Sequence, residues 1–113
     1  MSFENLRVYQ AAELLDKMVM ELIPRIPRGF ARDIDQLKRA SAAVAHNIAE
    51  AYGNDHGRKV LHLQIARGSA DETRSILRRL VGRGALTQKD IYSPCALAVT
   101  IAKMLTAWID RIE

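Results

Sequence analysis

Apolar residues recur at steps of three and four along four stretches of the chain, which is the period of amphipathic helices. The clearest pattern follows Gly84, where seven positions form a heptad seam: Ile91, Cys95, Ala98, Ala102, Leu105, Ile109 and Ile112. A seam of this kind is typical of a helix packed in a bundle. Thr87 and Asp90 resemble a capping box at its start, although Pro94 would also suit a helix that begins at Ser93.

Three clusters of proline, glycine and polar residues separate these stretches, at residues 24–29, 53–57 and 82–84. Pro24 and Pro27 would break a helix interior, and Gly84 suits the left-handed position just past a helix end. Long helices with short connections pack as antiparallel neighbours. The pattern therefore predicts an all-α fold, an up-and-down antiparallel four-helix bundle that forms one domain over residues 1–113.

The two middle stretches each carry one apolar stripe. On residues 30–52 the stripe has six members: Ile34, Leu37, Ser41, Val44, Ile48 and Tyr52. On residues 58–81 it has five members: Leu61, Ile65, Gly68, Ile76 and Leu80. Glu72 falls on this second stripe by its spacing, so we expect its carboxylate to lie in the core.

Two predicted helices carry more apolar or small residues on their surfaces than the core of a monomer requires. The stretch before Pro24 has a wide apolar face, and residues 30–52 carry alanines around the whole circumference of the predicted helix. Such surfaces favour a subunit interface, whereas alanine is also simply a good helix former on a solvent face. Both interpretations stay open, and the first predicts a homo-oligomer.

A polar network is expected between the second and third helices, formed by Asn47, Glu50, Ser69 and Glu72. A buried carboxylate is costly unless it is paired or hydrogen-bonded. The alternative is a metal site like that of di-iron bundles, which repeat Glu-x-x-His pairs on two helices. Gly53 and Ser75 stand where such pairs would need histidine, so we predict a structural hydrogen-bond network and no metal.

The composition agrees with one helical globular domain, because 49% of the 113 residues are hydrophobic and only 5% are aromatic. Cys95 is alone, which excludes an internal disulfide and a cysteine-based zinc cage. We see no catalytic constellation and no phosphate-binding loop, and so expect no enzyme activity and no cofactor. The uncharged stretch 91–102 is too short to span a membrane, and no secretory signal opens the chain, which predicts a cytoplasmic protein.

Positive charge concentrates in the third helix. The net charge is +4, with −1 over residues 1–55 and +5 over residues 56–113. The basic residues of the third helix are the candidate nucleic-acid-binding set: Arg58, Lys59, Arg67, Arg74, Arg78, Arg79 and Arg83.

Three of these arginines, Arg67, Arg74 and Arg78, share one helical face at steps of seven and four. Arginine forks to phosphate oxygens and stacks on bases, so this face is a plausible nucleic-acid footprint. The alternative is a solvated basic face, or arginines paired with acids of the first helix such as Glu13 and Asp16.

Four segments carry a family resemblance. They are Phe3–Ala12 (FENLRVYQAA), Gln36–Ala40 (QLKRA), Asn47–Gly53 (NIAEAYG) and Ile65–Glu72 (IARGSADE). In this order and spacing they resemble the opening, QLRRA, NIAEG and IA-x-GS-x-x-E segments of the four-helix-bundle proteins related to the 23S ribosomal RNA intervening-sequence protein.

This resemblance implies a bundle that assembles into a homopentameric barrel. One branch of the family is the accessory variability protein of diversity-generating retroelements, which binds nucleic acid and associates with a reverse transcriptase. We therefore expect a non-enzymatic oligomeric protein that binds RNA or DNA phosphates through its third helix. The alternative is an oligomeric scaffold or protein-interaction module without a nucleic-acid role.

Overall fold

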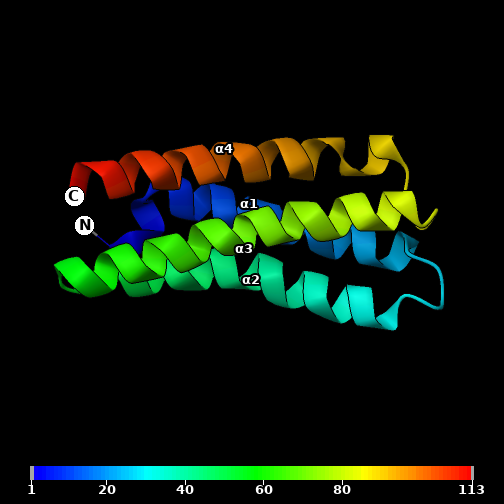
Figure 1. Ribbon diagram of the computed structural model, residues 1–113, viewed down its shortest axis with the longest axis horizontal. Helices are drawn as coiled ribbons and strands as arrows, with labels where there is room; N and C mark the ends of the chain where they lie inside the picture. The colour runs from blue at the N-terminus through cyan, green and yellow to red at the C-terminus, as the bar shows by residue number, and fades with distance from the viewer. Residues whose placement is uncertain (1, 113) are drawn as a thin grey trace.

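The computed structural model describes residues 2–112, which form four long helices and two short 3-10 turns. The helices are α1 (Arg7–Leu22), α2 (Ala31–Tyr52), α3 (His56–Gly82) and α4 (Gln88–Ile112). The 3-10 turns are η1 (Phe3–Asn5) and η2 (Ile23–Arg25). Successive helices run in opposite directions along an elongated body of 43 × 21 × 20 Å (Figure 1). The prediction of an all-α, up-and-down antiparallel four-helix bundle is confirmed.

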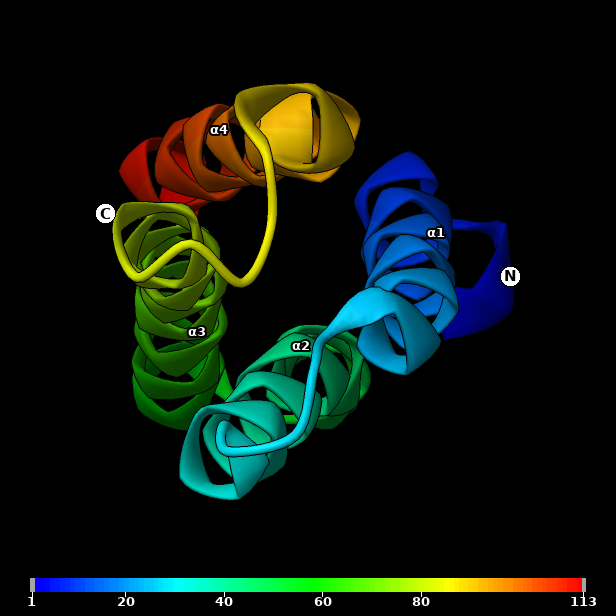
Figure 2. The same cartoon turned by 90° about the vertical axis from the view of Figure 1, so that its right-hand side faces the viewer.

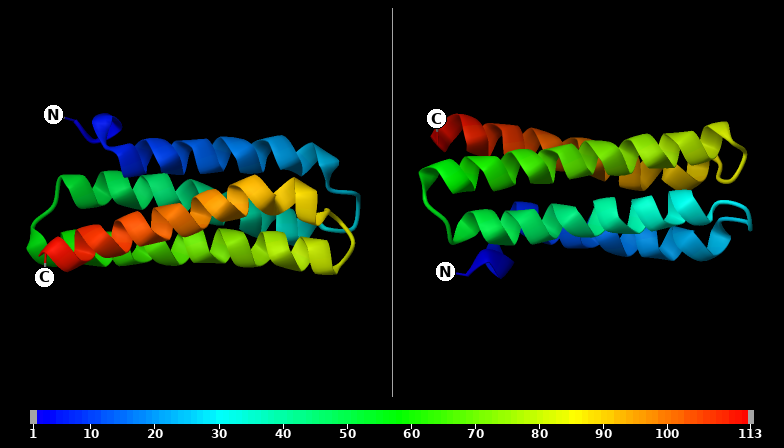
Figure 3. Two further views of the ribbon diagram at one scale, coloured as in Figure 1. Left: turned by 90° about the horizontal axis from the view of Figure 1, so that it is seen from above. Right: turned by 60° about the horizontal axis from the view of Figure 1, so that its bottom comes forward.

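The connections lie where the sequence breaks the helical pattern. Figure 3 shows the α1–α2 and α3–α4 loops at one end of the bundle, and the α2–α3 turn at the other end with both termini. Gly29 and Gly84 have φ angles of 101° and 78°, a backbone region that residues with a Cβ avoid. Each of these glycines lies in one of the loops, so the loop end of the bundle depends on both.

The start of α4 is set by its capping box. Thr87 Oγ1 accepts a hydrogen bond from the Asp90 N–H at 3.1 Å, and Asp90 Oδ2 accepts one from the Thr87 N–H at 2.9 Å. These two bonds satisfy donors that a helix start would leave unpaired. The helix therefore begins at Gln88 and continues through Pro94, which lies buried inside it and has no N–H to donate to the preceding turn.

All four helices contribute to one apolar core. Figure 2 looks along the bundle and shows α1, α2, α3 and α4 in chain order around the centre. The largest fully buried aliphatic side chains are Leu15, Val19, Leu37, Val44, Ile48, Leu63, Leu77, Leu80, Ile101 and Leu105. Burying one such side chain contributes about 1.5–3 kcal/mol, so this cluster is the main source of stability.

The register of α3 differs from the prediction. Its buried positions include Leu63, Ala66, Ala70, Thr73, Leu77 and Leu80. The expected stripe faces outward over its first half: Leu61 is 52% exposed, Ile65 is 42% exposed, and both Gly68 and Glu72 lie away from the buried positions. The expected core position of Glu72 is therefore wrong. The helix turns its small residues, such as Ala66, toward the core, and Glu72 faces solvent.

Candidate nucleic-acid interface

The structure divides the seven predicted basic residues into three groups. Arg58 and Lys59 lie in the first turn of α3, at the end of the bundle that holds the α2–α3 turn. The second group is Arg67, Arg74 and Arg78, which face α4. The third group is Arg79 and Arg83, which face α2. The seven residues therefore do not form one continuous site.

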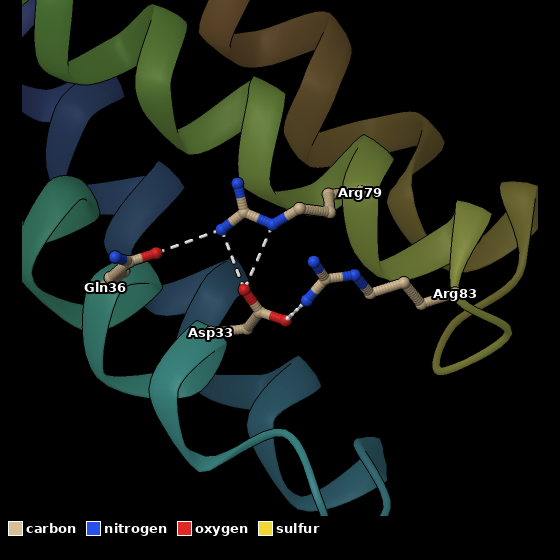
Figure 4. A network of polar contacts seen from close by, with 4 residues as sticks. All are labelled: Asp33, Gln36, Arg79 and Arg83. Carbon is tan, nitrogen blue, oxygen red and sulfur yellow. Dashed lines mark hydrogen bonds and ion pairs between the residues drawn. The ribbon is translucent and has the colours of Figure 1, made fainter.

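Asp33 in the first turn of α2 binds both arginines of the third group (Figure 4). Its Oδ1 accepts from Arg79 Nε at 3.1 Å and Nη2 at 2.7 Å, and its Oδ2 accepts from Arg83 Nη1 at 2.9 Å. Arg79 Nη2 also donates to Gln36 Oε1 at 3.0 Å. Asp33 is only 5% exposed, so these are charge-assisted bonds in a mostly desolvated place.

The two arginines stabilise the charged form of this carboxyl. The hydrogen bond from Arg79 lowers the pKa of Asp33, and the charges of Arg79 and Arg83 lower it further, against the opposing effect of burial. Arg79 and Arg83 thus already have a buried charged partner, which the arginines of the second group lack.

The expected pairing of arginines with acids of α1 is not what the structure shows. Asp16 instead accepts a hydrogen bond from the hydroxyl of Ser41 at 2.9 Å, which joins α1 to α2. The partner of the arginines lies on α2 because Arg79 and Arg83 project from the α2-facing side of α3.

The second group lines a groove between α3 and α4, which we call the α3–α4 groove. It consists of two adjoining hollows that share Arg74 and Val99. The first has a volume of about 400 Å³ and is lined by Arg74, Arg78, Gln88, Ile91, Tyr92, Cys95, Ala96 and Val99. The second has a volume of about 480 Å³ and is lined by Arg67, Asp71, Arg74, Val99, Ala102, Lys103, Thr106, Ala107 and Asp110.

The arginines of the groove are available for a ligand. Arg67 donates to the hydroxyl of Thr106 at 3.1 Å, a neutral partner on α4. Within residues 2–112, neither Arg74 nor Arg78 forms an ion pair with a carboxylate. Burial raises the pKa of the Cys95 thiol in this groove, and the nearby charges of Arg74 and Arg78 lower it in part. The groove therefore carries positive charge that the protein does not neutralise by direct contact.

Of the four residues of the predicted polar network, only Asn47 forms a side-chain pair between α2 and α3, and its partner is His62. Asn47 is buried, and its Oδ1 lies 3.0 Å from Nδ1 of His62, while its Nδ2 donates to the Ala43 carbonyl at 2.8 Å. Glu50 and Glu72 lie outside the buried faces of α2 and α3. The antiparallel register of α2 and α3 places His62 opposite Asn47, whereas Glu72 lies ten residues, about 15 Å, further along α3.

Ser69 is buried on α3, and its hydrogen bond with Thr73 stays within that helix. Its carbonyl accepts a hydrogen bond from the hydroxyl of Thr73 at 2.8 Å. No hydrogen bond among the described residues joins the side chains of Asn47, Glu50, Ser69 and Glu72 to one another. In residues 2–112 no group of three or more His, Cys, Asp or Glu side chains is placed to hold a metal ion.

No helix within residues 2–112 combines the length and apolar character that crossing a bilayer requires.

Sequence reasoning missed two residues that shape this surface. Asp33 was detectable, because it stands four positions before Leu37 on the apolar side of α2, where a carboxylate needs a partner. Tyr92 was detectable as a large aromatic residue outside the α4 seam. Neither signal identifies the partner helix, which depends on how α3 is rotated.

Comparison with known proteins agrees with this architecture. A family model described as 23S rRNA-intervening sequence protein matches residues 4–107. One solved structure, a protein of unknown function from the S23 ribosomal protein family of Bacteroides thetaiotaomicron, is 21% identical with a TM-score of 0.82. The match covers 90% of this chain and 97% of that one, and at this identity it shows the fold. No curated protein matches the chain.

Proposed function

The chain belongs to the 23S rRNA-intervening sequence protein family, and from this premise we propose that it is a non-enzymatic, oligomeric, nucleic-acid-associated protein. The proposed contact is between RNA or DNA phosphates and the arginines of the α3–α4 groove, Arg67, Arg74 and Arg78. The observation that carries the proposal is this row of arginines, which face an open groove without a carboxylate partner. The proposed site is smaller than the seven residues predicted from sequence. Asp33 binds Arg79 and Arg83, and Arg58 and Lys59 lie in the first turn of α3, outside the groove.

The spacing of the row suits a polyanion better than a single small anion. At 1.5 Å of rise per residue, Arg67 and Arg74 are separated by about 10 Å along α3, and Arg67 and Arg78 by about 16 Å. Arg74 and Arg78, one turn or about 6 Å apart, can share one phosphate, whereas Arg67 extends the row over a length that successive phosphates of a strand would cover. Such contacts position a strand and carry little sequence information, so we expect weak sequence preference.

Repetition of the groove in an oligomer would strengthen this binding. Several large apolar side chains are exposed on the single chain: Leu14, Met20, Leu61, Ile65 and Tyr92. Except for Tyr92, which lies in the groove, they are available for subunit contacts. A ring of five subunits, as the family resemblance implies, would multiply the grooves and raise avidity. Light scattering tests this part, and a mass near the 12.7 kDa of one chain at micromolar concentration would contradict it.

The alternative is a protein-interaction module, and one observation favours it. A hollow of about 540 Å³ lies between α1 and α4, lined by Asn5, Leu6, Arg7, Val8, Met104, Ala107, Trp108 and Arg111. Its apolar residues could receive a side chain of a partner protein, for which the family resemblance suggests a reverse transcriptase. Association through this hollow would tolerate salt, whereas phosphate binding through arginines would not.

The proposal is tested by replacing the three groove arginines with glutamine together. A matched control replaces Arg28, Arg32 and Arg39, which are exposed on the loop end and on α2, and removes the same charge. Binding of labelled RNA and DNA is measured by fluorescence anisotropy from 50 to 300 mM salt.

We expect the groove variant to bind far more weakly than the control variant. Its salt dependence should flatten by roughly 0.7–0.9 log units for each phosphate that the protein no longer binds. An equal decrease in affinity in both variants would show only a general charge effect and contradict the site. Absence of any retention by the wild type at 50 mM salt would contradict the proposed function itself.

A further inference from the structure

The α3–α4 groove combines its arginines with an aromatic side chain at one end. Tyr92, in the first turns of α4, is 76% exposed, more than any other large apolar side chain that the structure leaves open to solvent. It lines the first hollow of the groove together with Arg74, Arg78 and Gln88. An aromatic ring with an open face beside guanidinium groups is the arrangement on which an unpaired base can stack.

Charge distinguishes the Tyr92 end from the rest of the groove. Among the described residues no carboxylate lines the first hollow, although Asp71 lies beside Arg74 and Arg78 along α3 without forming an ion pair with either. The second hollow includes two carboxylates, Asp71 and Asp110, beside three cations, Arg67, Arg74 and Lys103, so its charge is partly offset within the hollow itself. The strongest attraction for a phosphate therefore lies next to the aromatic ring.

The order of the residues along the groove follows from the antiparallel packing of α3 and α4. The hydrogen bond between Arg67 and Thr106 shows which residues of the two helices lie opposite each other. Arg74 and Arg78 then lie successively nearer the α3–α4 loop, and Tyr92 stands close to that loop on the opposite wall. A strand that runs along the groove from the α3–α4 loop would therefore contact Tyr92 first and then the arginines, which bind its phosphates.

We propose that the groove selects single-stranded RNA or DNA, with one unpaired base stacked on Tyr92 and the adjoining phosphates bound by Arg78 and Arg74. This inference rests on the proposed function and names the class of nucleic acid. In a duplex both faces of each internal base are covered by its neighbours, so only an unpaired or terminal base can use the ring. Stacking on an aromatic ring tolerates any base, in keeping with weak sequence preference.

The experiment compares labelled single strands of about 15 nucleotides with the duplex of the same sequence, a length within the range that single-strand sites occupy. Four variants are used: Tyr92→Ala, Tyr92→Leu, Tyr92→Phe and Tyr92→Trp. Leucine keeps an apolar side chain without an aromatic face, and phenylalanine removes only the hydroxyl. Circular dichroism and thermal unfolding check that each variant keeps its fold, which we expect because the side chain is exposed.

We expect the wild type to bind the single strand more tightly than the duplex. Tyr92→Ala and Tyr92→Leu should weaken single-strand binding roughly 5- to 150-fold, the usual range for one stacked base. Tyr92→Phe and Tyr92→Trp should stay within about twofold of the wild type, and duplex binding should change little in any of the four. The inference is overturned if the duplex binds as well as the single strand, or if Tyr92→Ala leaves single-strand binding unchanged.

The outcomes also separate this inference from the proposal on which it rests. If replacing the groove arginines abolishes binding but Tyr92→Ala does not weaken it, phosphate binding stands and stacking is refuted. If the wild type binds neither form at low salt, both fail. If Tyr92→Ala and Tyr92→Phe weaken binding equally, the hydroxyl and not the ring is the contact, which also refutes stacking.

Discussion

Arg79 donates two hydrogen bonds to a single oxygen of Asp33, although the two residues stand 46 positions apart in the chain. The bond from Nε measures 3.1 Å and the bond from Nη2 measures 2.7 Å. Arg83 occupies the other oxygen, so one carboxylate ties the C-terminal end of α3 to the start of α2. Arg79 and Arg83 thus join two helices, whereas the arginines of the α3–α4 groove have no carboxylate partner among the described residues.

Replacing Asp33 with alanine should lower the free energy of unfolding by about 2–3 kcal/mol, because it leaves two arginines without their charged acceptor. Asp35→Ala is the control, since Asp35 is exposed and pairs only with Arg39 one turn away, and it should cost less than about 0.5 kcal/mol. Urea denaturation measures both values. Equal effects of the two substitutions would show that the buried junction contributes no more than a surface pair.

The stability of the protein should depend on the protonation of Asp33 in acid. Its pKa is lowered in the folded state, so its contribution is complete above its unfolded pKa of about 3.9 and is lost as the pH falls through the folded value. Unfolding experiments between pH 6 and pH 2 should therefore show a steeper loss of stability below about pH 4 in the wild type than in Asp33→Asn. Parallel curves for the two proteins would contradict the assignment.

The capping box makes the start of α4 sensitive to Thr87. Thr87→Ala removes the acceptor for the Asp90 N–H and should lower the free energy of unfolding by about 1 kcal/mol. The matched control is Thr100→Ala, because the Thr100 hydroxyl bonds only to the carbonyl of Ala96 within the same helix. This control should be close to neutral, since alanine is the better helix former. Chemical denaturation of the pair gives the comparison.

The observed register of α3 predicts opposite outcomes for two leucines that are two positions apart. Leu63 is fully buried, so Leu63→Ala should lower the free energy of unfolding by about 2–5 kcal/mol. Leu61 is more than half exposed, so Leu61→Ala should cost less than about 1 kcal/mol in the folding of a single chain. The predicted stripe would require the reverse order, so thermal or urea unfolding of these two variants decides between the registers.

Loss of association without loss of folding should follow when charge is placed on the outer face of α3. Leu61→Lys and Ile65→Lys together should leave the helical circular dichroism signal intact, because both side chains are exposed in the single chain. If this face contacts another subunit, sedimentation or light scattering should show a smaller assembly. An unchanged assembly would exclude this face as a subunit contact.

The sequence predicts the fold well because most of its signals are local. The α4 seam and the Thr87–Asp90 box depend on residues three or four positions apart, and loop positions such as Gly84 are fixed by backbone geometry. The predicted α3 stripe is correct at Ile76 and Leu80 and wrong over its first half, because large residues stand on the outer face there. Leu61 and Ile65 outweigh Ala66 and Ala70 in any pattern of hydropathy, although the alanines are the ones that pack.

The candidate site was predictable only in part, for a physical reason. The shared face of Arg67, Arg74 and Arg78 follows from their spacing, which any α-helix converts into a common direction. The capture of Arg79 by Asp33 is a contact between distant segments, and it depends on how α3 is rotated against α2. The periodicity of the sequence does not determine how α3 is rotated against α2. The structure was therefore needed to separate the arginines that pair with Asp33 from those that are open to a ligand.

Cys95 gives the wild-type chain one position for labelling with a thiol reagent. It is the only cysteine in the sequence, and it lines the α3–α4 groove beside Tyr92. A maleimide fluorophore or spin label would therefore attach at a single known site, with no engineered cysteine. Because burial raises the pKa of its thiol, coupling should be slower than for a free cysteine at neutral pH, where lysine amines do not compete for the maleimide. In an assembly each subunit would carry one such label, so distances measured between labels would report how the grooves are arranged in that assembly.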